Sequence, residues 1–495
     1  MADQTTTTPT PTFGRALRKQ FLFPENYTNL NHGSFGAIPS SVLAHRQKLI
    51  LLSEQYPDNF MRYHSISLLD ESRALLAKIL NVSVAETVFV TNATSGVNTV
   101  LRNLTYEEGD IIIHFGTIYG ACGRTVHYIT DTTAAECVSI PLSYPVSDAQ
   151  IITLFRSTVA ELKNAGKKPK LVIFDTISSM PGMRFPWEKM IVAAKEDGVL
   201  SLIDGAHGVG NIKIDLGKHE PDFFVSNCHK WLYTPRPAAV LFVPLRNQNL
   251  ISTSIPTSHY YLPKSQAQYW SPLRSGAKSN FELQFEFNGT VDMTTYLSVP
   301  AAIKFREEIG GEDAIVNYCN TLAFEGGAEV AKILGTEIMT PDASSPDGGR
   351  CAMVNIRLPL LPIPQSEVES VYHTFTKEIG TKENTFVQVY VHHGAWWVRL
   401  SAQVYLETKD FIWIAEILKR ECDGINERVK KLVTKEVNEK ENKTEGTNKK
   451  ENNKEGPNGV KSVDVHVEEM KKGVNGVEKG VEGLAVSNGR GKVLA

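Results

Sequence analysis

Asp204 and Lys230 are the two residues whose types and spacing most directly indicate chemistry. Asp204 ends the apolar stretch Leu202-Ile203, and Lys230 follows beyond a second apolar stretch at 223–225. Taken singly, the aspartate could belong to an ordinary turn and the lysine could cap a strand. If neighbouring parallel strands hold both, the amine can form a Schiff base with an aldehyde while the carboxylate pairs with a pyridine nitrogen. The pair therefore predicts an enzyme that uses pyridoxal 5'-phosphate.

A segment of small polar residues supports this cofactor. Thr91-Asn92-Ala93-Thr94-Ser95-Gly96 follows the apolar stretch 88–90 and opens a helical pattern. Small side chains let backbone amides approach a phosphate, and a helix N-terminus favours negative charge. The same residues could form a plain helix cap. Their position upstream of the candidate Schiff-base lysine favours phosphate binding.

Alternating strand and helix patterns must position these residues. Between residues 40 and 290 we expect strands at 111–115, 137–140, 171–174, 199–203 and 239–243, and helices near 65–80, 96–104, 119–131, 148–164 and 186–197. Short apolar strands separated by helices predict an α/β fold with a mostly parallel sheet covered on both faces. Ligands of such sheets bind beyond the carboxyl ends of the strands, where Asp204, Asp175 and the loop after Phe115 are expected.

The pattern changes after about residue 295, which predicts a second, smaller α+β domain. Helices are expected at 296–308, 311–334 and 408–430, and strands at 351–357, 386–391 and 396–401. We divide the chain into an N-terminal arm at 1–36 with disorder at 1–12, a large cofactor domain at 37–294, a small domain at 295–430 and a tail at 431–495. The tail lacks aromatic residues and is rich in Lys, Glu, Asn and Gly, so we expect it to be disordered.

The composition limits the classes of function. The chain has 495 residues and a net charge of −3, which argues against nucleic acid and a membrane surface as partners. The six cysteines show neither a C-x-x-C pair nor zinc spacing, so we predict no metal site and reduced thiols. The N-terminus lacks the apolar core of a secretory signal, and no apolar run suits a membrane helix. We expect a cytoplasmic enzyme.

The motifs occur in the order seen in class V pyridoxal-phosphate enzymes, and the chain resembles the isopenicillin N epimerase-like branch. Within it the chain is most similar to fungal hercynylcysteine sulfoxide lyases and loline-pathway aminotransferase-like enzymes. The resemblance covers residues 13–430 and implies fold type I and a homodimer. The segments that carry it are the arm 30–36, the loop 91–96, Gly116–Gly123, Ser178–Gly182, Asp204–His207, His229–Trp231, Asn288–Thr290 and Arg399–Leu406.

The resemblance also implies roles for individual residues around the cofactor. Lys230 forms the Schiff base and Asp204 pairs with the pyridinium nitrogen. His207 contacts the phenolic oxygen, where many relatives have glutamine. The phosphate is held by Ala93, Thr94, Asn227 and His229, and by Thr290 of the second subunit.

On the substrate side, the resemblance implies that Arg399 holds the α-carboxylate through a bidentate fork. Asn31 and His32 of the arm are expected to contact substrate. Tyr119 would stack over the cofactor and could protonate a departing group. Plainer readings are a buried packing tyrosine at 119, a surface ion pair at 399 and a structural cap at His32.

The reaction depends on what leaves the substrate. Residues 380–399 contain no cysteine, whereas desulfurases of this fold need a nucleophilic cysteine shortly before the carboxylate-binding arginine. We therefore expect β-elimination from a cysteine conjugate such as hercynylcysteine sulfoxide, giving pyruvate and ammonia. A loline-type enzyme, an epimerase or a transaminase acting on another amino acid is the alternative. A non-catalytic scaffold is disfavoured by the intact Lys230, Asp204 and Arg399.

Overall fold

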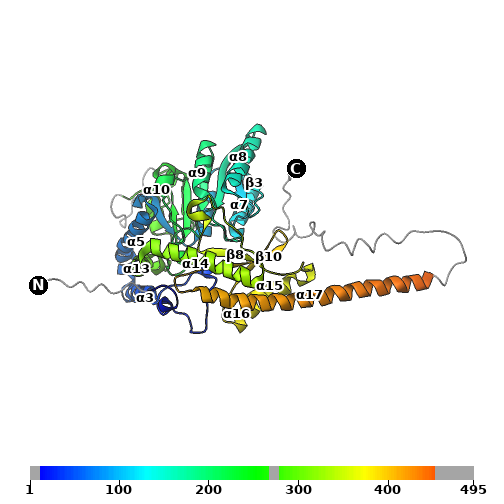
Figure 1. Ribbon diagram of the computed structural model, residues 1–495. Coiled ribbons are helices and arrows are strands. Elements are labelled where there is room, and N and C mark those ends of the chain that lie inside the picture. Colours follow the sequence, from blue (N-terminus) through cyan, green and yellow to red (C-terminus); the bar gives the residue numbers. More distant parts are fainter. Residues whose placement is uncertain (1–11, 267–277, 452–495) are drawn as a thin grey trace.

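The computed structural model describes residues 12–266 and 278–451, and its core is a seven-stranded sheet (Figure 1). The predicted disorder at 1–11 and 452–495 lies outside the described residues. The strand order is β1-β7-β6-β5-β4-β2-β3. The strands are β1 (Thr87–Val90), β2 (Asp110–Phe115), β3 (Glu136–Ile140), β4 (Lys168–Asp175), β5 (Leu200–Asp204), β6 (Phe223–Asn227) and β7 (Ala239–Phe242).

The sheet is mostly parallel, as predicted. Only β7 runs against its neighbours, β1 and β6. Strands β2 to β6 are parallel because each connection between them crosses over a face of the sheet. Apolar residues alternate between the two faces along each strand, so both faces need a cover. This is why these strands read as continuous apolar runs in the sequence.

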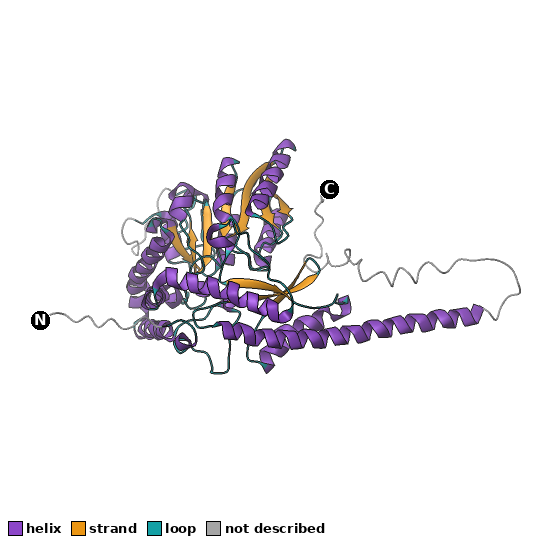
Figure 2. Ribbon diagram, viewed as in Figure 1, coloured by secondary structure: helices purple, strands orange, loops and turns teal. Residues whose placement is uncertain are grey.

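Helices cover both faces (Figure 2). One buried apolar cluster joins α6 (Ala93–Asn103) and α7 (Gly120–Thr132) to residues such as Ile112 and Leu202. The opposite face, with Ile113 and Ile203, packs in the main cluster with α8 (Asp148–Asn164) and α9 (Trp187–Glu196). Three further helices, α3 (Ser40–Gln55), α5 (Ser65–Leu80) and α13 (Val299–Glu308), contribute to that main cluster. The sheet is thus a rigid central layer that positions the residues at its strand ends.

The C-terminal part of the chain forms a second, antiparallel sheet in the order β8-β10-β9. Its strands are β8 (Met353–Arg357), β9 (Gln388–His392) and β10 (Ala395–Ser401). The long helix α14 (Gly311–Leu334) packs against β8 and beside α17 (Thr408–Glu451), as Figure 1 shows. All three strands of this second sheet follow residue 295, where the sequence pattern changes.

The last helix is longer than predicted. We expected a helix to 430 and disorder beyond, but α17 continues to Glu451 and projects from the body of the molecule (Figures 1 and 2). Its last core residue is Val429. Residues after 430 have little apolar surface to bury, which predicts disorder. Lys and Glu are nevertheless good helix formers, and they extend a helix that a packed segment has already nucleated.

Two negative findings apply to the described part of the chain. None of its helices combines the length and apolar character that crossing a bilayer requires. Within the same residues, no group of three or more His, Cys, Asp or Glu side chains is arranged to hold a metal ion.

Candidate active site

The carboxyl ends of β4, β5 and β6 bring three ionisable residues together. Asp175 ends β4 and Asp204 ends β5, and the two are in register. Strand β6 leads directly into the short helix α11 (Cys228–Trp231), which carries Lys230. Because β5 and β6 are parallel neighbours, Asp204 and Lys230 lie at the same edge of the sheet.

Lys230 points its amine at His207, with Nζ 3.1 Å from Nε2. No carboxylate among the described residues forms an ion pair with it. Burial, and then the charge of Arg399, lower the pKa of Lys230 to about 8. The amine is therefore largely uncharged in mildly alkaline solution, which is the form that attacks an aldehyde.

Asp204 is held by two donors. Its Oδ1 accepts a hydrogen bond from the amide of Ala206 at 3.0 Å, and its Oδ2 accepts one from the thiol of Cys122 at 3.3 Å. Burial raises the pKa of Asp204, and burial with the nearby Asp204 charge raises that of Asp175 well above its usual range. Asp175 is thus the protonated member of the pair, and Asp204 is the carboxylate positioned for a cationic partner.

His207 is buried between Lys230 and an indole. The Trp231 Nε1–H donates to its Nδ1 across 3.2 Å. Burial, followed by the charges of Lys230 and Arg399, lowers the pKa of His207 well below its usual value. The imidazole is therefore neutral, with one nitrogen bonded to the indole and the other facing the lysine amine.

The segment 91–96 forms the N-terminus of α6, as expected for an anion site. Asn92 caps the helix by accepting from the Ser95 amide. The amide of Ala93, predicted to bind phosphate, instead donates to Oδ1 of Asn227 at 2.9 Å. That side chain reaches across from β6, a contact between distant segments that the local sequence does not reveal. The amide of Thr94 has no partner within the helix and remains the donor for an anion.

His229 and Thr290 are the other two residues that we predicted to contact the phosphate. The His229 Nδ1 is 2.8 Å from the carbonyl oxygen of Ala238, and burial lowers the pKa of this imidazole to about 4. His229 is therefore neutral. Thr290 is exposed on the loop after α12 (Asn280–Glu286).

Arg399 is a buried cation that forms no ion pair with any carboxylate in the described part of the chain. Its side chain is 2% exposed, and it donates to the carbonyl oxygen of Ser179 at 2.7 Å, to Oδ1 of Asn31 at 2.9 Å and to Oγ of Ser34 at 3.0 Å. Its Nε has no partner among the described residues. Burial lowers the pKa of Arg399 to about 10. A surface ion pair is thus excluded, and an anionic ligand would relieve the unbalanced charge.

The N-terminal arm contributes differently from the prediction. Asn31 contacts Arg399, but both ring nitrogens of His32 are used by the protein. Its Nε2 donates to the backbone carbonyl of Lys230 at 2.7 Å, and Nδ1 lies 3.0 Å from the Tyr405 hydroxyl. His32 therefore fixes the turn that carries the lysine, in place of the predicted substrate contact.

Tyr119 occupies the N-cap position of α7, in the loop after β2. Its side chain is 46% exposed, so it is not a buried packing tyrosine. This leaves the phenol accessible to a ligand.

Three contributors were missed by sequence reasoning. Cys122 bonds Asp204, Trp231 bonds His207, and the loop with Ser179 supports Arg399. Cys122 and Trp231 lie inside the motifs that carry the family resemblance. No local signal shows which partner each would find.

Comparisons with known proteins identify the family. The model of the aminotransferase class-V family matches residues 42–358. The chain belongs to the class-V aminotransferase family. Family membership indicates pyridoxal phosphate as the cofactor and confirms that prediction. The residues present suit such a group, since Asp204, Lys230 and the Thr94 amide offer a carboxylate, an amine and an anion donor near one edge of the sheet.

Several curated relatives match most of the chain. The chain is 35% identical over 441 residues to the L-cysteine desulfhydrase-like protein lolT2 of Epichloe uncinata, covering 84% of this chain and 95% of that one. It is 31% identical over 410 residues to the hercynylcysteine sulfoxide lyase of Schizosaccharomyces pombe, covering 83% and 98%. The isopenicillin N epimerase of Streptomyces clavuligerus is 26% identical and covers 69% and 83%.

Solved structures support the predicted fold. The cystine C–S lyase C-DES in complex with cysteine persulfide matches with a TM-score of 0.64 at 16% identity, covering 80% of this chain and 98% of that one. A cysteine desulfurase from Thermococcus onnurineus gives the same TM-score at 16% identity, covering 83% and 98%. The chain therefore has the fold type I architecture.

Proposed function

We propose that this chain is a C–S lyase that eliminates a sulfur group from Cβ of a cysteine conjugate, giving pyruvate and ammonia. The observation that carries the proposal is Arg399, a buried cation that no described carboxylate neutralises. An amino acid brings the α-carboxylate that fits this guanidinium. The names of relatives, an L-cysteine desulfhydrase-like protein and a hercynylcysteine sulfoxide lyase, support the same substrate class.

The cysteines argue for elimination over persulfide chemistry. Burial raises the pKa of Cys228 to about 12 and that of Cys351 to about 11, and raises the pKa of Cys122 further. Thiols of this kind are not nucleophiles at neutral pH. The strand β10, which carries Arg399, and the preceding β9 contain no cysteine. The sulfur would leave with the product and would not be retained on the enzyme.

The cofactor contacts are assigned to individual residues. Lys230 would hold the aldehyde carbon, Asp204 the ring nitrogen and His207 the phenolic oxygen. The Thr94 amide, the side-chain amide of Asn227 and His229 would face the phosphate, with Thr290 of a second subunit completing it in a homodimer. When bound, the protonated ring accepts electrons from the substrate Cα.

The protein residues then supply the proton transfers. The freed amine of Lys230 takes the Cα proton, and the Cβ–S bond breaks with its electron pair on sulfur. Tyr119 donates a proton to the departing sulfur group. One water hydrolyses the remaining enamine to pyruvate and ammonia. Arg399 keeps the α-carboxylate fixed while the leaving group departs.

A panel of cysteine conjugates tests this function. Pyruvate is assayed for cysteine, cystine, an S-alkyl cysteine and hercynylcysteine sulfoxide, with Lys230→Ala as the control. Borohydride reduction and mass spectrometry should find the pyridoxyl adduct on Lys230 alone. Pyruvate formation that requires Lys230 supports the lyase. Epimerised or transaminated amino acid without pyruvate would support the alternative secondary-metabolism enzyme.

A further inference from the structure

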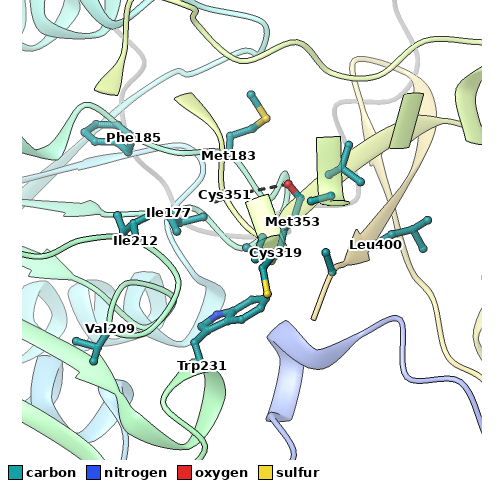
Figure 3. Close-up of a cluster of buried hydrophobic side chains, with 14 of the residues drawn as sticks. Ile177, Met183, Phe185, Val209, Ile212, Trp231, Cys319, Cys351, Met353 and Leu400 are labelled. Carbon is teal, nitrogen blue, oxygen red and sulfur yellow. Dashed lines mark hydrogen bonds between the residues drawn. The ribbon is translucent and has the colours of Figure 1, made fainter. Parts of the chain in front are cut away.

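Trp231, His207 and Lys230 form a chain of hydrogen bonds just after β6, in which Trp231 and His207 are buried and Lys230 is partly buried. The indole Nε1 lies 3.2 Å from His207 Nδ1, and His207 Nε2 lies 3.1 Å from the Lys230 amine. Trp231 is 1% exposed and belongs to the apolar cluster of Figure 3, which also holds Met353 and Leu400. The interaction between Trp231 and Lys230 therefore passes through one imidazole ring.

The donor groups fix the proton on that ring. An indole N–H donates only, so Nδ1 of His207 has to accept. A doubly protonated ring would set two N–H groups against each other, and it would add a cation next to Lys230. A neutral ring that accepts at Nδ1 carries its proton at Nε2, the nitrogen that faces the amine.

We propose that Trp231 is a positioning residue that fixes His207 in the Nε2–H tautomer, so that the imidazole donates to the uncharged amine of Lys230. Ammonium has no lone pair and cannot accept this bond, so the bond favours the form that reacts with the cofactor. The proposal rests on Lys230 being the cofactor-binding residue. Its test measures a lysine pKa, so it can fail while the proposed reaction stands.

Trp231 is held firmly enough for this role. Its backbone carbonyl accepts from Nη1 of the buried Arg306 at 2.8 Å. A Cβ on Gly33 would lie 3.1 Å from the indole ring, and one on Gly210 would lie 2.7 Å from the Trp231 backbone. The indole ring cannot move away from His207 without displacing the arm at Gly33 or the backbone around Gly210.

Other charges also act on Lys230, and they remain when Trp231 changes. Asp204 on β5 and Asp175 on β4 raise the pKa of the amine, Arg399 on β10 lowers it, and Cys122 on α7 and His229 lie near it. A variant that removes only the indole N–H therefore isolates the imidazole.

Competitive labelling of the full-length, cofactor-free protein tests the proposal. Acetic anhydride labels Lys230 between pH 6 and 11, and mass spectrometry gives its pKa. In Trp231→Phe the imidazole can adopt the other tautomer and accept from the ammonium, so we expect the Lys230 pKa to rise by about one unit, the worth of one hydrogen bond. Trp187→Phe is the matched control, because Trp187 is equally buried and its Nε1 has no partner among the described residues. An unchanged Lys230 pKa in Trp231→Phe, or an equal rise in both variants, overturns the proposal.

Two further measurements separate this role from packing. In a His207→Leu background, Trp231→Phe should leave the Lys230 pKa unchanged, and a remaining shift would show that Trp231 does not act through the imidazole. The tautomer of His207 can also be measured directly in the wild-type protein by nitrogen-15 NMR with labelled histidine. The variant His207→Gln assigns the signal, and the measurement does not depend on whether a Trp231 variant folds. It should report a protonated Nε2 and a bare Nδ1 at His207, and the opposite tautomer would refute the proposal.

Discussion

The guanidinium of Arg399 donates to the side-chain oxygen of Asn31 across 2.9 Å, although the two residues lie 368 positions apart in the chain. The contact joins the small domain to the N-terminal arm. It also shows why Arg399 can stay charged in a buried site, because neutral oxygens from two segments, the arm and the loop with Ser179, solvate it in place of a carboxylate.

Replacing Arg399 by lysine should weaken substrate binding far more than cofactor binding. Lysine cannot form the two-pronged bond to a carboxylate, and losing one such charged bond costs about 2–3 kcal/mol, or roughly a 100-fold fall in kcat/KM. Steady-state pyruvate assays with absorbance spectra of the bound cofactor measure both. Arg357→Lys is the control, since Arg357 lies on β8 and pairs with Glu337 at the surface. Equal kcat/KM values for the two variants would contradict the assignment.

Removing the Cys122 thiol should alter the pH profile. Its bond lowers the pKa of Asp204, so Cys122→Ala raises that pKa, and the acid limb of kcat should move to higher pH. We expect about a five-fold lower kcat at neutral pH, the worth of about one hydrogen bond. Cys122→Ser keeps a donor and should restore the wild-type profile. An alanine profile identical to wild type would exclude this contact from catalysis.

Cofactor capture should depend on pH with a midpoint set by Lys230. The amine reacts when uncharged, and burial lowers its pKa to about 8 from the ordinary 10.5. The rate of loading should therefore rise with pH, pass its midpoint near 8 and level off above it. Stopped-flow absorbance after mixing cofactor-free protein with pyridoxal phosphate measures this. A midpoint near 10 would show that the amine is not perturbed.

Gly36 should be required for the lysine turn. It has a φ of +68°, and a Cβ there would lie 1.9 Å from the carbonyl oxygen of His229. Gly36→Ala should lower the free energy of unfolding by about 1–2 kcal/mol because of the backbone conformation, and by about 1–3 kcal/mol more because of the steric clash. Gly166→Ala is the control, because Gly166 has a φ of +73° and open space around it. Thermal unfolding and cofactor content should separate the two, and equal losses would argue against the clash.

The sheet and its edge were predictable from local pattern. Asp204 is the last residue of β5 and Lys230 lies in the short helix just after β6, so their place at one edge of the sheet could be predicted from the order of residues. The partners that tune them come from elsewhere in the chain. The oxygens around Arg399, the Asn227 side chain on the Ala93 amide and the use of His32 as a clamp all depend on tertiary contacts.

The helices show the same difference between what local sequence predicts and what tertiary contacts decide. Those flanking the sheet have polar and apolar faces that the sequence reveals, and they agree with the predictions to within a few residues. The helix α3 was not predicted, since its apolar residues form no single stripe. The sequence does not predict the extension of α17 past residue 430, because that segment has almost no apolar residues to pack in a core.

The arm has a consequence for biosynthesis. Residues 31–33 are synthesised more than 360 residues before their partners Arg399, Ser401 and Tyr405. The last strand of the central sheet ends at Phe242, so all seven strands are synthesised before these partners. A polypeptide that ended before residue 399 would therefore lack the contacts that hold the arm, so the arm can take up its place beside β10 only after that strand has been synthesised.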